Sequence, residues 1–188
     1  MKFAYIPNAI TLSRLFLVPV LILALKDHKY LTGLIIFVIA GITDALDGYI
    51  AKRFDLVSQL GAVLDPLADK VLLVSAYVML TVIGHVPFWL LLAVGFRDLL
   101  IVGGYLVVTS MMGAVQMHPS YLSKLNTFVQ ILLVIVILTQ EAAALSFPRI
   151  TQALIFLVLL TTVASGGHYL WQWGIKRELE SVAGPKKS

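Results

Sequence analysis

Four aspartates stand close together in the first half of the chain, between segments that are otherwise strongly apolar. They form two pairs, Asp44 with Asp47 and Asp65 with Asp69. Residues three or four apart in a helix share a face, with Cβ atoms about 5–6 Å apart. Carboxylates at membrane depth are costly unless they have cations to bind, so we predict a metal-dependent active site.

The donor set of this predicted site consists of carboxylate oxygens, which favour Mg²⁺ or Mn²⁺, with Ca²⁺ as a further candidate. We expect a polar loop over residues 52–60 to join two antiparallel helices and bring both aspartate pairs to the same depth. Four carboxylates around one point can hold two divalent cations roughly 3.5–4 Å apart, as in phosphoryl-type displacements. The alternative interpretation is that the aspartates only cap helices and complement helix dipoles.

Three neighbours of the aspartates suit a phosphorylated ligand. Gly48 and Gly61 are expected to flank the loop, where a missing Cβ lets the backbone approach a bulky ligand. Lys52 supplies a point charge for a phosphate oxygen. The stretch therefore predicts a site for a phosphate-bearing substrate and its metals.

The composition sets the class of protein. The chain has 188 residues, of which 60% are hydrophobic and 13% charged, and its mean hydropathy is +0.95. These values indicate an integral membrane protein. The absence of cysteine excludes disulfides, a thiolate nucleophile and a cysteine-based zinc site. The net charge of +4 fits contact with anionic lipid headgroups and membrane orientation better than nucleic-acid binding.

We predict an all-α, polytopic membrane protein, a six-transmembrane-helix bundle that forms a single domain over residues 1–188. The expected spans cover about residues 9–25, 31–51, 61–83, 87–109, 123–142 and 149–173. The first apolar run is interpreted as a span and not as a signal peptide, because Asn8 and Arg14 interrupt it and no cleavage site follows. Lysine and arginine are more frequent on the side of the two termini, which predicts cytoplasmic termini. The site would then face the cytoplasm of a bacterial inner membrane.

The aspartate stretch resembles the signature of the CDP-alcohol phosphotransferases, which reads D-x-x-D-G-x-x-A-R, then eight residues, then G-x-x-x-D-x-x-x-D. The chain keeps every spacing of this signature with Asp44, Asp47, Gly48, Ala51, Lys52, Gly61, Asp65 and Asp69. Lys52 stands where the family usually has arginine, so the charge is kept and the fork geometry is lost. The six-span layout extends the resemblance over nearly the whole chain.

The resemblance implies that a phosphatidyl group passes from CDP-diacylglycerol to an alcohol, with release of CMP. It implies that Asp44, Asp47 and Asp65 ligate two divalent metals that grip the diphosphate. Asp69 would complete the set as metal ligand and as general base for the acceptor hydroxyl. A homodimer is also implied.

A second group of residues is expected near the CDP-lipid. Besides Asp44, this group contains Asn8, Thr11, Arg14, Gly48, Ala51, Lys52 and Gly61. The first three match a P-N-x-x-T-x-x-R opening whose spacing lines up one helix face. A helix cap is the alternative role for Asn8.

The aspartate signature does not specify the acceptor alcohol, so we infer the acceptor from other segments of the chain. Phosphatidylglycerophosphate synthases, which use glycerol 3-phosphate, resemble one another in a fourth-span arginine pair and a fifth-span G-K-x-K-T. This chain keeps Arg97 but has Tyr105 at the second arginine position, and Asn126 replaces the second lysine after Lys124. Two fewer cations favour phosphatidylglycerol, the less charged acceptor, and local strings such as TTVAS resemble CMP-forming cardiolipin synthases. We therefore expect acceptor contacts from Arg97, Lys124 and Asn126.

Three alternatives stay open at this point. Arg97 could form an ion pair with Asp98 that only holds helices together. Lys124 could be an orientation signal without a role in binding. The whole protein could be a cation-coupled transporter or channel, although its acids cluster at one edge and do not form a path across the membrane.

Overall fold

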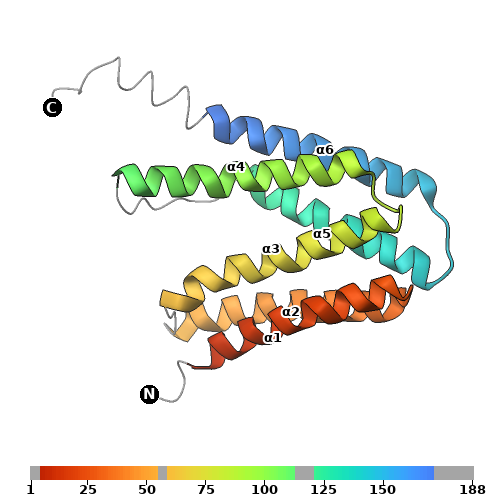
Figure 1. Cartoon of the computed structure of the whole chain (residues 1–188), viewed down its shortest axis with the longest axis horizontal. Helices are drawn as coiled ribbons and strands as arrows, with labels where there is room; N and C mark the ends of the chain where they lie inside the picture. Colours follow the sequence, from red (N-terminus) through yellow and green to blue (C-terminus); the bar gives the residue numbers. More distant parts are fainter. Residues whose placement is uncertain (1–4, 55–58, 113–120, 172–188) are drawn as a thin grey trace. The chain divides into compact units, whose positions relative to one another are not determined.

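The computed structural model describes residues 5–54, 59–112 and 121–171, and their side chains at positions 16–43, 70–104, 121–169 and 171. In these ranges the regular structure is helical, which confirms the predicted all-α class (Figure 1). The six helices are α1 Tyr5–Lys26, α2 Tyr30–Phe54, α3 Gln59–Val82, α4 Phe88–Met112, α5 Tyr121–Ala142 and α6 Pro148–Leu170.

The first helix begins earlier than the apolar pattern indicates. We expected a helix start at about residue 9, and this expectation is wrong because α1 already begins at Tyr5. Asn8 lies inside α1, so its alternative role as a helix cap is wrong as well. Pro7 therefore lies in the first turn. A proline is tolerated there because the first backbone N–H groups of a helix have no partner within the helix.

The connection between α2 and α3 is shorter than predicted. The helix α2 continues to Phe54 and α3 begins at Gln59, so the expected polar loop over residues 52–60 is wrong in its bounds. Lys52 and Gly48 lie inside α2, and Gly61 lies inside α3. The segment AKRF at the end of α2 contains neither proline nor glycine, so nothing in it stops the helical hydrogen bonding. The other helix ends lie within about three residues of the predicted spans.

The chain forms two compact units. The first unit contains residues 1–87 and 131–151, and the second contains residues 88–130 and 152–188. In the first unit α1 packs against both α2 and α3 (Figure 1). Gly33 of α2 permits this packing, because a Cβ at this position would lie 2.7 Å from Cδ2 of the buried Leu25. The fully buried side chains of this unit include Leu21, Leu25, Tyr77, Leu80, Leu133 and Ile137.

Three turns in the described part of the first unit use left-handed backbone conformations. His28, between α1 and α2, has φ of 54°, Gly84, after α3, has φ of 93°, and Ala144, after α5, has φ of 51°. All three lie between predicted spans. Gly84 suits this conformation because it lacks a Cβ, whereas a histidine there is uncommon.

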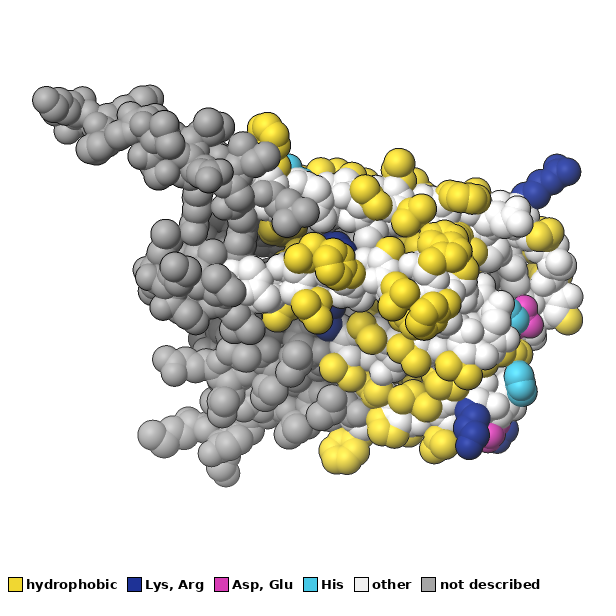
Figure 2. Space-filling view, turned by 45° about the horizontal axis from the view of Figure 1, so that its top comes forward, with side chains coloured by type: hydrophobic (Ala, Val, Ile, Leu, Met, Phe, Trp, Pro, Cys, Tyr) yellow, Lys and Arg dark blue, Asp and Glu magenta, His cyan; other side chains and the backbone are white. Residues whose placement is uncertain are grey.

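Large hydrophobic side chains cover much of the described surface, and charged side chains gather at one end of the first unit (Figure 2). Two helices in the described ranges, Tyr121–Ala142 and Pro148–Tyr169, are long and apolar enough to cross a membrane. Shorter apolar helical segments occur at Phe16–Lys26, Tyr30–Thr43 and Lys70–Val82. The six-span arrangement with cytoplasmic termini stays a prediction.

Candidate functional site

The two aspartate pairs lie in helices on either side of the α2–α3 connection. Asp44 and Asp47 belong to α2, and Asp65 and Asp69 belong to α3. Because residues three or four apart on a helix share a face, each pair can present its carboxylates on one side of its helix. The side chains of all four aspartates lie outside the described residues.

The chemistry of this donor set fits hard divalent cations, because every member is a carboxylate. Among the side chains that the structure describes, no group of three or more histidine, cysteine, aspartate or glutamate residues could hold a metal ion. The predicted CDP-lipid residues Asn8, Thr11, Arg14, Gly48, Ala51, Lys52 and Gly61, together with Tyr105, also lie outside the described side chains. For these residues the sequence predictions stand as predictions.

Arg97 of α4 lies in a buried polar cluster of the second unit. Only 3% of the residue is exposed, and four hydrogen bonds hold its guanidinium group. Nη1 donates to Asp98 Oδ1 at 2.6 Å, while Nη2 and Nε donate to Ser165 Oγ at 2.9 and 3.3 Å. Nη2 also donates to Ser123 Oγ. Arg97 therefore connects α4 to α5 and α6.

The Arg97 cluster is consistent with both roles considered from the sequence. Asp98 is the ion-pair partner expected for a purely structural arginine, and its side chain is also largely buried. The serine hydroxyls, in contrast, accept hydrogen bonds without cancelling the positive charge. A buried guanidinium held by one carboxylate and two neutral hydroxyls has a fixed orientation.

Asn126 of α5 lies in a second polar cluster of the same unit. It is fully buried, and its Oδ1 accepts hydrogen bonds from Thr161 and Thr162 of α6, each at 2.9 Å. The other end of the amide, Nδ2, is buried without a hydrogen-bond partner among the described residues. The two described partners of Asn126 are hydroxyl groups, so its surroundings on α6 suit a neutral side chain.

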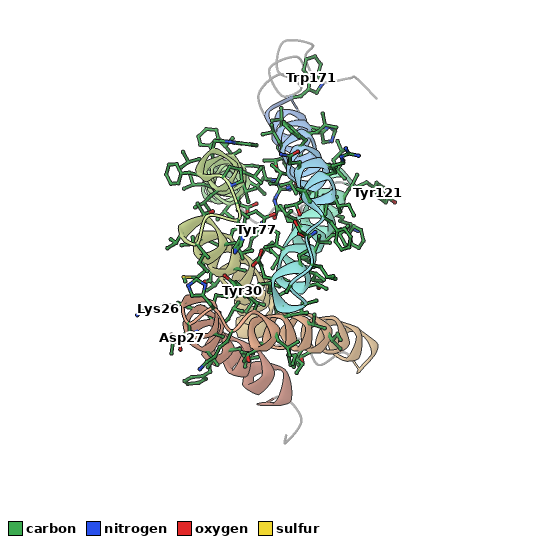
Figure 3. The ribbon with its side chains drawn as sticks, turned by 90° about the vertical axis from the view of Figure 1, so that its right-hand side faces the viewer. Lys26, Asp27, Tyr30, Tyr77, Tyr121 and Trp171 are labelled. Carbon is green, nitrogen blue, oxygen red and sulfur yellow. The ribbon has the colours of Figure 1, made fainter. Side chains whose placement is uncertain are left out.

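Lys124, the third predicted acceptor residue, is exposed and makes a different kind of contact. Its Nζ lies 5.7 Å from the ring centroid of Tyr121, which is itself 90% exposed. Tyr121 projects away from the helices in Figure 3. Lys124 thus keeps its ammonium group at the surface, where it can meet a headgroup or a soluble phosphate, and the described contacts do not join it to the Arg97 cluster.

From the sequence alone, the string TTVAS, residues 161–165, gives only a resemblance and assigns no role to the α6 partners of Arg97 and Asn126. Thr161, Thr162 and Ser165 are all buried, although each has a hydroxyl group within an apolar helix. Their signal was the spacing of three hydroxyl residues at positions that share one helix face. Such residues are easily overlooked because serine and threonine can satisfy their own hydroxyls on helix carbonyls, as Thr161 does on Leu157 at 2.9 Å.

A separate polar cluster lies in the first unit, near the α1–α2 turn. The Tyr30 hydroxyl is 2.8 Å from His28 Nδ1 and 3.3 Å from His85 Nε2, and His85 Nδ1 is 3.5 Å from Glu141 Oε1. Tyr30 lies close to the turn that carries Lys26 and Asp27 (Figure 3). Partial burial, and then the charge of Glu141, raise the pKa of Tyr30 above its ordinary value. The sequence reasoning treated the histidines as scattered, because positions so far apart show no shared spacing.

Comparisons with known proteins agree with the aspartate signature. Residues 4–164 match the family model described as CDP-alcohol phosphatidyltransferase. The chain is 31% identical over 185 residues to the CDP-diacylglycerol–glycerol-3-phosphate 3-phosphatidyltransferase of Bacillus subtilis, with 89% of this chain and 95% of that protein covered.

Two further relatives carry a different activity in their names. The chain is 35% identical over 180 residues to a cardiolipin synthase (CMP-forming)/mitochondrial hydrolase fusion protein of Schizosaccharomyces pombe. It is 33% identical over 187 residues to the cardiolipin synthase (CMP-forming) of Rattus norvegicus. Each match covers 87% of this chain, but only 30% of the fusion protein and 60% of the rat protein. The chain thus spans less than two thirds of these two relatives and nearly all of the Bacillus protein.

Proposed function

This chain belongs to the CDP-alcohol phosphatidyltransferase family, and we propose that it transfers a phosphatidyl group from CDP-diacylglycerol to phosphatidylglycerol, which gives cardiolipin and CMP. The family predicted from the aspartate signature is confirmed, and with it the enzyme class at the level of the family. Family membership also favours an enzyme over the cation-coupled transporter considered from the sequence.

The proposed roles of the aspartates follow from their chemistry. Asp44, Asp47 and Asp65 would hold two divalent cations, Mg²⁺ or Mn²⁺, together with Asp69. When bound, such cations neutralise charge on the diphosphate of the donor and on the leaving CMP. Asp69 would accept the proton of the acceptor hydroxyl. The acceptor oxygen then bonds to the phosphorus of the phosphatidyl group, and the bond from this phosphorus to the oxygen of CMP breaks.

The surroundings of Asn126 are the observation that supports phosphatidylglycerol as acceptor. Asn126 is fully buried against the hydroxyls of Thr161 and Thr162. A lysine at this position would bring a charge into surroundings whose described partners are neutral, which is costly unless a counter-ion is present. A neutral side chain here matches an acceptor that carries a single negative charge rather than a free phosphate dianion.

Purified protein with CDP-diacylglycerol, Mg²⁺ or Mn²⁺ and one acceptor at a time tests this proposal. We expect release of CMP and formation of cardiolipin with phosphatidylglycerol. CMP release with glycerol 3-phosphate alone would contradict the choice of acceptor, and no CMP release with either acceptor would contradict both activities. A double variant, Tyr105→Arg with Asn126→Lys, should increase the use of glycerol 3-phosphate relative to phosphatidylglycerol. Leu125→Lys is the matched control, because it adds a charge to an exposed position of α5.

Phosphatidylglycerophosphate synthesis from glycerol 3-phosphate is the second candidate function. It is favoured by one observation, that the chain covers 95% of the Bacillus relative whose name states this activity. Arg97 and Lys124 would then both contact the acceptor phosphate. The chain keeps one basic residue of the fourth-span arginine pair and one of the fifth-span lysine pair. The acceptor assay above distinguishes the two candidates directly.

We propose further that the protein is a homodimer in a bacterial cytoplasmic membrane, with six spans and both termini in the cytoplasm. The distribution of lysine and arginine supports this orientation. Because the chain has no cysteine, single cysteines can report the side of the membrane. A membrane-impermeant maleimide should label Asp27→Cys on intact cells, and Ser188→Cys only after permeabilisation. The reverse pattern would contradict the orientation, and chemical cross-linking of purified protein tests the dimer.

A further inference from the structure

We propose that a hydroxyl face of α6, formed by Thr161, Thr162 and Ser165, positions the acceptor-binding side chains and sets how tightly the acceptor is held. The inference rests on the proposed function, because it takes Arg97 and Asn126 to contact the acceptor. It assigns individual roles to three residues of the TTVAS string, which from the sequence alone carries only a resemblance.

The first support is that two acceptor residues from different helices meet the same face of α6. Arg97 in α4 donates to Ser165, and Asn126 in α5 accepts from Thr161 and Thr162. Positions 161 and 165 are four apart and positions 162 and 165 three apart, so the three hydroxyls share one side of the helix.

Ser165, together with Asp98 and Ser123, holds the orientation of the Arg97 guanidinium. Its Oγ accepts from both Nε and Nη2, at 3.3 and 2.9 Å. Two donors of one planar group that share a single acceptor atom restrict rotation of the guanidinium plane. The next residue, Gly166, also faces the arginine, since a Cβ there would lie at an ordinary contact distance of 3.8 Å from Arg97 Cγ. The direction of the arginine charge thus depends on α6.

Thr161 and Thr162 determine the orientation of the Asn126 amide. One end of the amide faces the two hydroxyls, and the opposite end is buried without a hydrogen-bond partner among the described residues. This holds in either orientation of the amide, because a hydroxyl can both donate and accept. A buried amide end without a partner is costly, and a hydroxyl group of the acceptor could satisfy it whichever atom it presents.

The acceptor that fits both Arg97 and Asn126 is a polyol phosphate. Arg97 suits the phosphate charge, while the open end of the Asn126 amide suits a neutral hydroxyl. The headgroup of phosphatidylglycerol and glycerol 3-phosphate share this chemistry. They differ in the charge on the phosphate, so the experiment uses both as probes.

Steady-state kinetics of the full-length enzyme with four variants test the inference. Ser165→Ala removes the hydroxyl that binds Arg97, and Thr162→Val removes one of the hydroxyls that bind Asn126. Thr162→Ser keeps the hydroxyl. Thr139→Val is the matched control, because this exposed threonine donates only to a carbonyl of its own helix, Ile135 O, at 2.7 Å. The first two variants should raise KM for the acceptor about tenfold and leave KM for CDP-diacylglycerol unchanged. Thr162→Ser and Thr139→Val should behave like the wild type with either acceptor.

Three results would overturn the inference. One is an equal rise of KM for donor and acceptor, and another is an unchanged acceptor KM in both Ser165→Ala and Thr162→Val. The third is a Thr162→Ser variant as impaired as Thr162→Val, because this would assign the effect to packing. If Ser165→Ala does not fold, the two Thr162 variants decide alone. Failure of the proposed function can be distinguished from failure of this inference, because in that case the wild-type enzyme itself would release no CMP with either acceptor.

Discussion

The hydroxyl oxygen of Tyr30 lies 3.3 Å from the Nε2 atom of His85, although Tyr30 begins α2 and His85 lies in the α3–α4 turn. Tyr30 also contacts His28, and His85 contacts Glu141 at the end of α5. The four side chains thus connect the α1–α2 turn, the α3–α4 turn and the last turn of α5 within the first unit. This cluster should contribute to the stability of that end of the helices.

The stability of the protein should decrease above the ordinary ionisation range of tyrosine because of Tyr30. Burial, and then the charge of Glu141, raise the pKa of Tyr30 from its ordinary value of 10.0. As the pH rises past about 10, the unfolded chain loses this proton before the folded chain does, so unfolding becomes more favourable. Thermal unfolding of wild type and Tyr30→Phe between pH 8 and 11 should therefore show a steeper loss for the wild type. Parallel curves would contradict this prediction.

Removal of the charge of Glu141 should make Tyr30 easier to ionise. Glu141 is the second cause of the raised pKa, and its carboxylate also contacts His85. In Glu141→Gln the pKa of Tyr30 should be lower than in the wild type, because no negative charge opposes the tyrosinate. Ultraviolet difference titration against a Tyr30→Phe background isolates this residue from the other tyrosines. An unchanged titration would leave burial as the sole cause.

Two glycines of α2 should respond in opposite ways to alanine. A Cβ at Gly33 would lie 2.7 Å from Cδ2 of the fully buried Leu25, whereas a Cβ at Gly41 would have nothing within 4 Å. Gly41→Ala should stabilise the protein by about 1 kcal/mol through helix propensity. Gly33→Ala should destabilise the protein, because overpacking against Leu25 costs about 1–3 kcal/mol and outweighs the gain in helix propensity. Unfolding of the two variants in the same detergent tests the difference, and equal stabilities would show that Leu25 can move aside.

Asp69→Asn should abolish turnover while CDP-diacylglycerol binding is largely kept. If Asp69 is the general base, its removal should lower kcat by about 10²–10⁴-fold. The amide keeps the size of the side chain and much of its hydrogen bonding. CMP release and equilibrium binding of CDP-diacylglycerol should be measured on the same preparation. An equal loss of binding would instead make Asp69 chiefly a metal ligand.

Lys52→Arg should preserve or increase affinity for CDP-diacylglycerol. Arginine is the usual residue of the family signature at this place, and its fork can bind a phosphate through two parallel hydrogen bonds. Lys52 lies in α2, so the substitution changes the side chain without requiring a new backbone conformation. Binding and KM for the donor measure the effect. A collapse of affinity would mean that Lys52 has a specialised role in this chain.

The class of the fold and the family could be predicted from the sequence, because both depend on local features. Apolar runs of about twenty residues predict helices, and the aspartate signature is a pattern of fixed spacings along one stretch. Helix ends were less predictable. Pro7 and the segment AKRF show why. A proline, which can end a helix, also fits in the first turn of one, and a polar segment can continue a helix.

The sequence by itself determined that this protein is an all-α member of the CDP-alcohol phosphatidyltransferase family, with Arg97 and Asn126 as candidates for acceptor binding. Only the tertiary structure decided which distant residues meet them. Ser165 and the two threonines of α6 approach from another helix, as His85 approaches Tyr30. Such contacts depend on how packed helices are rotated and shifted against one another. The apolar pattern within a single helix of this chain does not specify that rotation, because both the exposed and the buried sides of the helices carry hydrophobic residues.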